Sequence, residues 1–228
     1  MGQLTLNQGR GKIDLILSHF ASADNPNIAQ TEEQFNRFRH LIPSFENVRF
    51  SISNSFGIYA AKRYHLDQVR SGMAIFGLNP TPGRPNPMHP AVELQAQILQ
   101  IQDVKGGETC GYGATYKLPR NSRLATIGIG YGDGFPLHLS NSGTVYWVYG
   151  TGKDYERSYP CSVLGRVSMD LTIIDLTDIP SAHEPQPGDW VEIIGPRQSA
   201  DELAKDAGTI GYEILTSLGA RHARFYID

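Results

Sequence analysis

The chain has 228 residues, of which 40% are hydrophobic and 19% charged, as is usual for a globular protein. Its formal net charge of -3 at pH 7 leaves no basic excess of the kind that nucleic-acid-binding proteins carry. No apolar run approaches the roughly 18 residues that a membrane span needs, and the polar, glycine-rich residues 1–11 do not resemble a signal peptide.

Three short strands are predicted in the first part of the chain, and polar residues follow each of them. The apolar run Ile13–Leu17 is typical of a strand buried on both faces, and Ser18 and His19 follow it. A second strand is predicted over Val48–Ile52. A third is predicted near Asp67–Val69, with apolar sequence continuing through Met73–Leu78.

One helix is predicted between the first two strands. Thr31–Gln34 has the pattern of a capping box, in which Thr31 would be the N-cap. Apolar side chains then recur at helical spacing, and Pro43 should end the helix. These apolar residues are Phe35, Phe38, Leu41 and Ile42.

This order of elements is typical of a parallel α/β barrel, whose active site lies at the carboxyl ends of its strands. Three strands cannot close an eight-stranded barrel of about 250 residues. Residues 1–87 are therefore predicted to be the C-terminal part of a (β/α) barrel.

The breaker-rich segment Thr81–Pro87 predicts a linker, after which residues 88–228 are predicted to form a β-rich C-terminal domain. Turn residues separate its strands, as in an antiparallel barrel or sandwich. The expected strands are residues 92–101, 124–129, 144–148, 163–167, 171–176 and 190–194. A second capping box, Ser199–Glu202, opens a helix, and a helical stripe then runs to Leu218. The predicted fold class is thus α/β plus β.

Candidate binding residues follow the three expected strands, so we expect them to converge at one edge. They are His19, Asn54, Ser55, Arg70, Gly72 and Met73. Ser55 can donate a hydroxyl to an anion, and Gly72 allows backbone N–H groups to approach it. Singly, His19 could be a core histidine, Arg70 an ion-pair partner and Ser55 a turn residue. Their shared position at strand ends favours a binding site.

Other motifs carry weaker signals. Gly128–Gly134 lacks the third glycine of GxGxxG, and Pro136 argues against the helix which that motif must open, so turn glycines are expected instead of a nucleotide site. Cys110 and Cys161 lie far apart without a CxxC motif or a nearby histidine cluster. Neither a structural disulfide nor a metal site is predicted, and a reducing cytoplasm is the expected location.

Seven segments, in order along the chain, resemble motifs of the alanine racemase family. They are Ser18–Asp24, Asn54–Ser55, Val69–Leu78, Gly111–Tyr116, Ile129–Gly134, Gly165–Asp170 and Thr209–Leu215. The resemblance implies an isomerase that interconverts L- and D-alanine through an aldimine with pyridoxal 5'-phosphate (PLP), supplying D-alanine for the cell wall. It also implies a homodimer with composite active sites.

The resemblance implies that one group of residues binds the cofactor. His19 would stack on the pyridine ring, Arg70 would face the ring nitrogen, and Asn54, next to Ser55 in its motif, would also belong to the cofactor site. The phosphate would be held by Ser55, Gly72, Met73 and Tyr212. A guanidinium stays charged and only donates hydrogen bonds, so the ring nitrogen would stay unprotonated and PLP would be a weaker electron sink.

A second group would serve catalysis across the dimer interface. Racemisation needs a base on each face of the Cα carbanion. Tyr112 resembles the family's catalytic tyrosine, which the partner subunit contributes opposite the PLP lysine. Tyr131, Met169 and Asp170 would lie near the substrate carboxylate and the access channel. Two departures are visible: Ser168 where many members have cysteine, and Gly132 where alanine is commoner.

The family's PLP lysine and its substrate-binding arginine precede the His19 motif, and no lysine here lies in a matching motif. We therefore expect this chain alone to be inactive and to require an N-terminal fragment as a partner. Two alternatives remain open at this stage. One is a related PLP-dependent decarboxylase of basic amino acids, whose cysteine-bearing motif has no likeness around Cys110 or Cys161. The other is a non-catalytic dimerisation or binding module formed by residues 88–228.

Overall fold

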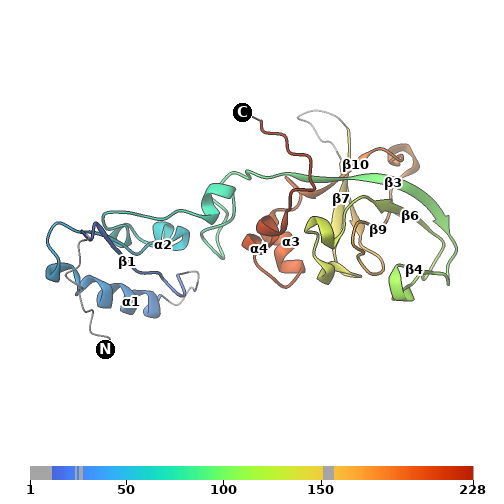
Figure 1. Cartoon of the computed structure of the whole chain (residues 1–228). Coiled ribbons are helices and arrows are strands. Elements are labelled where there is room, and N and C mark those ends of the chain that lie inside the picture. Colours follow the sequence, from blue (N-terminus) through green and yellow to red (C-terminus); the bar gives the residue numbers. More distant parts are fainter. Residues whose placement is uncertain (1–11, 24, 26–27, 151–156, 228) are drawn as a thin grey trace. The chain divides into compact units, whose positions relative to one another are not determined.

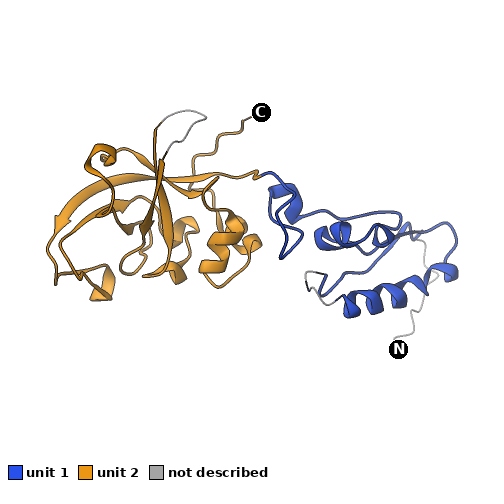
Figure 2. Cartoon of the chain, turned by 180° about the vertical axis from the view of Figure 1, so that it is seen from behind, with its two compact units in different colours: residues 1–89 blue, residues 90–228 orange. Residues whose placement is uncertain are grey.

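The computed structural model describes residues 12–23, 25, 28–150 and 157–227. The chain divides into two compact units, residues 1–89 and 90–228, which Figure 2 colours separately. Each unit is described by itself below. The expectation for residues 1–11, and Asp24 of the first family-like motif, lie outside the described residues.

The first unit contains one parallel strand pair. Strands β1 (Leu15–Leu17) and β2 (Arg49–Ser51) pair in register, with Leu15 opposite Arg49, and helix α1 (Ala29–Arg39) lies between them in the chain. Such a parallel pair needs a crossover connection, and the helix provides it. The other elements are the short helices η1 (Ile42–Ser44), α2 (Ser55–Ala60), η2 (Lys62–Tyr64) and η3 (Met73–Phe76).

An aromatic core holds α1 against the strands. Phe20 and Phe35 each meet the Tyr64 ring edge-on, with centroids 5.1 and 5.0 Å away. Phe38 packs in the same way on Phe50 of β2. The prediction that Phe35 and Phe38 face the core is therefore confirmed, and edge-to-face pairs of this kind stabilise beyond the area they bury.

Two predictions for this unit were wrong. Thr31 is not an N-cap: α1 begins at Ala29, and the Thr31 hydroxyl donates to the Ser22 carbonyl. The third strand is absent. The Asp67 carboxylate accepts a hydrogen bond from the Phe50 N–H of β2. In a third strand, that N–H would have donated to a backbone carbonyl instead. Leu17 of β1 is 58% exposed in this chain. The apolar sequence that continues through residues 73–76 forms η3.

A buried phenol and an arginine lower the pKa of Glu32 in α1. The Tyr64 hydroxyl donates to Oε1 of Glu32, and Arg63 forms an ion pair with the same oxygen. The pKa of Glu32 is lower in the folded chain than in the unfolded chain, so its ionised carboxylate stabilises the fold. This stabilisation is complete above the unfolded pKa and is lost as the pH falls through the folded pKa.

We therefore expect the free energy of unfolding of this unit to depend less on pH in Glu32→Gln than in the unchanged chain, below a pH of about 5. Hydrogen exchange of the α1 amides across this pH range measures the effect. Glu33→Gln is the matched control, because Glu33 lies next in α1 and forms its ion pair with exposed Arg37. Identical acid profiles for Glu32→Gln and the unchanged chain would contradict the assignment.

The second unit is built on one antiparallel sheet in the strand order β8-β7-β10-β3-β6-β9. Its strands are β3 (Leu94–Val104), β6 (Ser122–Ile127), β7 (Thr144–Tyr149), β8 (Arg157–Ser162), β9 (Thr172–Asp175) and β10 (Trp190–Ile194). The sheet curls, as Figure 1 shows, and its two edges meet where Val163 bridges to Ile174. Of the two antiparallel forms predicted, the structure has the barrel-like one.

Alternate side chains along the strands fill the interior of this barrel. In β3, Leu94, Ala96 and Ile98 are buried while Leu99 is half exposed. This two-residue period is that of a strand with one face on the core. The other elements are β4 (Thr109–Cys110), η4 (Tyr112–Ala114), β5 (Tyr116–Lys117), η5 (Tyr131–Asp133), η6 (Leu137–Leu139), η7 (Ser181–His183), α3 (Ala200–Asp206) and α4 (Gly211–Ser217).

The strand predicted over residues 163–167 was wrong, and β8 was missed. Only Val163 makes a bridge, because Gly165 turns the chain at a φ of 74°. Pro160 sits within β8, which an edge strand tolerates. The capping box of α3 is confirmed: Ser199 Oγ accepts from the Glu202 N–H, and Glu202 Oε2 accepts from the Ser199 N–H.

Within the described ranges, no helix is both long and apolar enough to cross a membrane. Both cysteines are free, and burial raises the pKa of the Cys161 thiol to about 12.

Candidate functional site

The loop after β2 begins the first cluster of polar residues. Asn54 is the N-cap of α2, where its Oδ1 accepts from the Gly57 N–H at 3.0 Å. Its Nδ2 lies 3.2 Å from Nε2 of His19, which follows β1. Parallel pairing of β1 and β2 brings these two strand ends together, as the sequence predicts.

Arg70 binds the same two strand ends. Its Nη1 donates to Ser51 Oγ and its Nη2 to the Ser18 carbonyl, both at 2.6 Å, and Nη2 lies 3.3 Å from Nδ1 of His19. Among the residues that the structure describes, no carboxylate forms an ion pair with Arg70. The guanidinium is thus fixed by neutral acceptors and keeps its positive charge available to a ligand.

Ser55 joins this cluster to the segment before η3. Its side chain is buried, and Oγ accepts from the Gly72 N–H at 3.0 Å and from the Ala74 N–H at 3.4 Å. A Cβ at Gly72 would meet nothing within 4 Å, so the space beside this amide is open. Met73 begins η3 with its side chain buried. The Ser55 hydroxyl, held by two backbone N–H groups, therefore lies beside open space and can donate to a phosphate.

The structure thus brings six of the seven predicted cofactor residues into one cluster of the first unit. Tyr212, the seventh, lies on α4 of the second unit and is 38% exposed. Sequence reasoning missed Ser51 and the Ser18 carbonyl, which fix Arg70. Ser51 and Ser53 are buried polar residues two apart at the end of β2, and this spacing could have marked Ser51.

The residues expected to act across a dimer interface lie on three joined turns of the second unit. Tyr112 in η4 is 72% exposed, and Tyr131 in η5 and Met169 are about half exposed. The Tyr131 N–H donates to the Ser168 carbonyl at 3.0 Å, and the Gly132 N–H donates to the Met169 carbonyl at 2.8 Å. Tyr131, Met169 and exposed Asp170 are therefore presented by one backbone-linked surface.

Two glycines join the Tyr112 turn to this surface. Gly111 and Gly165 have φ values of 76° and 74°, which favour glycine. A Cβ at Gly111 would lie 2.7 Å from the Arg166 nitrogen, and one at Gly165 would lie 2.7 Å from the Cys110 carbonyl oxygen. Asn141, which sequence reasoning missed, fixes the contact because its Oδ1 accepts from the Gly165 N–H.

A parallel βαβ segment with a phosphate-type donor set, followed by an antiparallel β domain, is the organisation of the fold type III PLP enzymes. The chain belongs to the alanine racemase family. Residues 2–80 match the model described as "Alanine racemase, N-terminal domain", and residues 91–226 match "Alanine racemase, C-terminal domain". Members of this family are isomerases that use PLP.

Individual relatives agree with this assignment. The chain is 44% identical over 220 residues to an alanine racemase of Acidiphilium cryptum. The aligned region covers 96% of this chain and 58% of the relative. It is 42% identical to a biosynthetic alanine racemase of Agrobacterium fabrum, covering 93% of the chain and 55% of the relative. A crystal structure of the Bartonella henselae alanine racemase, with covalently bound PLP, superimposes with a TM-score of 0.86 at 38% identity. That match covers 95% of this chain and 57% of the other. The chain thus spans less than two thirds of these relatives.

Proposed function

We propose that the chain contributes to an alanine racemase that interconverts L- and D-alanine with PLP. The observation that supports this most strongly is the donor cluster of His19, Asn54, Ser55, Arg70 and Gly72 at the ends of β1 and β2. In the proposal, residues 1–87 are part of a (β/α) barrel, and residues 88–228 are its β-rich C-terminal domain. A cytoplasmic location and a role in supplying D-alanine for the cell wall belong to the same proposal.

The donor set fits PLP at both ends of the cofactor. The Ser55 hydroxyl, whose Oγ accepts from the Gly72 and Ala74 N–H groups, can donate its proton to the phosphate, with Met73 beginning the same turn. The imidazole of His19, exposed and steadied by Asn54, offers a flat face for the ring. Tyr212 is assigned to the phosphate by its motif alone.

Arg70 has the chemistry to set the protonation of the cofactor's ring nitrogen. A permanent cation that only donates hydrogen bonds binds an unprotonated nitrogen and disfavours a protonated one. PLP, when bound, makes the Cα–H bond of its amino acid acidic by withdrawing electrons. With Arg70 at the ring nitrogen this withdrawal is moderate, which suits removal and return of one proton without further bond breaking.

Tyr112 is proposed to hold the proton on one face of Cα. Its exposed position on η4 suits a residue that serves a partner subunit's site, so we propose a homodimer. Tyr131, Met169 and Asp170, on the surface joined to the Tyr112 turn, would meet the substrate carboxylate of the same site. Alanine is the proposed substrate.

The lysine that bonds PLP is proposed to come from polypeptide beyond this chain, because none of the lysines here lies in a matching motif. For testing, this chain is joined to the part of the Acidiphilium cryptum relative that it does not cover. This protein is called the hybrid enzyme below.

The cofactor site is tested on this chain without relying on the lysine. Pyridoxine 5'-phosphate lacks the aldehyde that reacts with surface lysines, so it probes the non-covalent contacts alone, and comparison with pyridoxine isolates those of the phosphate. We expect it, and inorganic phosphate more weakly, to shift the amide NMR signals of Gly72 and Ala74, whereas pyridoxine should not. Arg37→Met, which removes an exposed cation of the same unit, should not alter the response. Equal shifts with pyridoxine and its phosphate, or none at Gly72, would overturn the proposed site.

A further inference from the structure

Two turns of the second unit are held together by their backbones. They are η5 with its flanking glycines (Gly130–Gly134) and the turn Ser168–Asp170, which are joined by the Tyr131 and Gly132 N–H bonds described above. The approach is so close that a Cβ at Gly130 would lie 2.3 Å from the Ser168 carbonyl oxygen. The positions of Tyr131 and Met169 therefore depend on each other.

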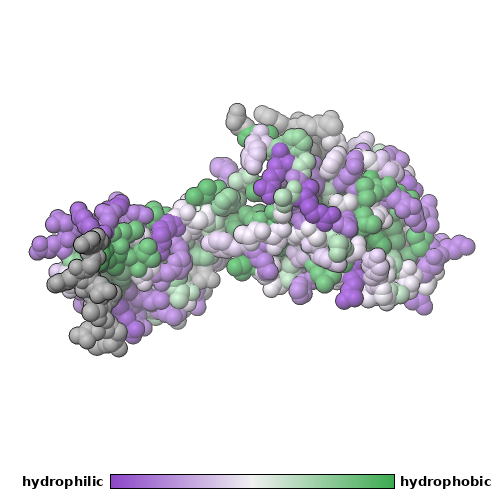
Figure 3. Space-filling view, in the orientation of Figure 1, coloured by the Kyte–Doolittle hydropathy of each residue, from purple (hydrophilic) through white to green (hydrophobic). Residues whose placement is uncertain are grey.

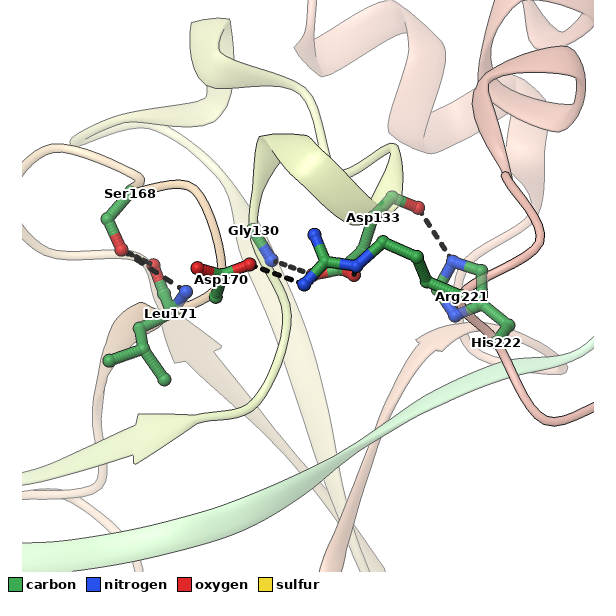
Figure 4. Close-up of polar contacts among 7 residues, drawn as sticks. All are labelled: Gly130, Asp133, Ser168, Asp170, Leu171, Arg221 and His222. Carbon is green, nitrogen blue, oxygen red and sulfur yellow. Dashed lines mark hydrogen bonds and ion pairs between the residues drawn. The ribbon is translucent and has the colours of Figure 1, made fainter.

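Arg221 joins the same two turns through their side chains. Its Nε lies 3.3 Å from Oδ1 of Asp133, and its Nη2 donates to Oδ1 of Asp170 at 2.5 Å. Figure 4 shows the guanidinium between the two carboxylates, one from each turn. A Cβ at Gly132 would lie 2.5 Å from Nη1 of Arg221, so glycine there leaves room for the guanidinium.

The Asp133 end of this arrangement is largely buried. The Asp133 side chain is 13% exposed, and its Oδ2 accepts from the Gly130 N–H at 3.0 Å. His222, the residue after Arg221, has its Nε2 2.6 Å from the Asp133 carbonyl oxygen. The segment after α4 is therefore anchored on η5 at two consecutive residues.

The chemistry of this position is specific to arginine. A guanidinium presents several donors in a planar fork, so it can serve two carboxylates at once, whereas an ammonium is a single point charge. The hydrogen bond that Arg221 donates to Asp170, followed by the charge of Asp133, raises the pKa of Arg221 above its usual value. An exposed ion pair contributes little alone, but here the partner carboxylate of Asp133 would stay largely buried if the arginine were lost.

We infer that Arg221 is a positioning residue, which holds the Tyr131 turn and the Met169–Asp170 turn in the relative arrangement that receives the substrate. This inference rests on the proposed function, in which Tyr131, Met169 and Asp170 meet the alanine carboxylate. Arg221 acts through Asp133 and Asp170 and touches no reacting atom. Its contribution is therefore to substrate binding more than to proton transfer.

The structural part of the inference, that Arg221 holds the two turns together, is tested on this chain by amide hydrogen exchange. In Arg221→Met, which keeps the length of the side chain without its charge, we expect the Tyr131 and Gly132 amides to exchange about five- to tenfold faster. Arg221→Lys should restore only part of the protection, because it can serve one carboxylate at a time. The control is Arg120→Met: Arg120 is equally exposed and pairs with Asp178, but it contacts neither turn. Unchanged exchange in Arg221→Met would overturn the inference.

The functional part is tested in the hybrid enzyme. We expect Arg221→Met to raise KM for alanine about fivefold to tenfold while kcat stays within about twofold. Arg221→Lys should recover part of the change in KM, and Arg120→Met should change neither constant. A loss of kcat at constant KM, or no change in either, would contradict the positioning role. If the unsubstituted hybrid enzyme does not racemise alanine, the proposed function fails, whereas the exchange experiment still decides whether Arg221 holds the turns.

Discussion

Replacing Tyr112 by phenylalanine is expected to lower racemisation by the hybrid enzyme about 10³-fold, which is the usual contribution of a general acid or base. The expected loss is asymmetric. Without the Tyr112 hydroxyl, the Cα proton should still exchange from the enantiomer that faces the other base, while exchange from its mirror image should nearly stop. Exchange of the α-proton of L- and of D-alanine in D2O, followed by NMR, measures both.

The fold should not suffer from this substitution, because Tyr112 is 72% exposed and the change removes one surface hydroxyl. Tyr116→Phe is the matched control, since Tyr116 lies on β5, immediately after the same turn. It should leave racemisation within about twofold of the unsubstituted rate. Equal slowing of α-proton exchange from both enantiomers in Tyr112→Phe would contradict the role assigned to this tyrosine.

Gly130→Ala is expected to destabilise the second unit by about 3 kcal/mol, the upper part of the usual range for overpacking. The backbone of Gly130 is extended, so the expected cost comes from the clash of the new methyl group alone. That group would lie 2.3 Å from the Ser168 carbonyl oxygen and 2.5 Å from the Met169 carbonyl carbon. Neither backbone atom can move without breaking the hydrogen bonds from Tyr131 and Gly132. Urea unfolding followed by tryptophan fluorescence gives the change in free energy.

Gly128→Ala controls for the loss of glycine itself. Its new methyl group would meet only the Leu99 side chain, at an ordinary 3.5 Å, so we expect a change within about 1 kcal/mol. Similar losses for the two variants would show that the close contact between the turns does not contribute to stability.

The order of the elements and much of the β-rich part could be predicted because burial on one face leaves a period in the sequence. Trp190–Ile194 was predicted with the bounds of β10, and the α3 capping box was recognised from its own residues. Local signals failed where tertiary contacts decided the outcome. The Thr31 hydroxyl donates to the Ser22 carbonyl instead of capping α1. The Asp67 carboxylate accepts the Phe50 N–H that a third strand would have paired with.

The candidate site shows the same division. His19, Asn54, Ser55 and Arg70 could be proposed together because each follows an apolar run, and parallel pairing of β1 and β2 then brings them into contact. Arg221 carried no such signal. It follows α4 in a segment with no regular structure, and its partners Asp133 and Asp170 are 88 and 51 residues away. Only the folded chain shows that these three residues meet.

The measurement that tests the proposed activity most directly follows alanine itself. The hybrid enzyme is supplied with PLP and with L-alanine or D-alanine in D2O, and both enantiomers and any amine product are quantified by chiral chromatography. We expect either enantiomer to become an equal mixture carrying α-deuterium, and this chain alone to produce none. A folded hybrid enzyme that binds PLP but leaves the starting enantiomer unchanged, or that releases ethylamine by decarboxylation, would contradict the proposed activity.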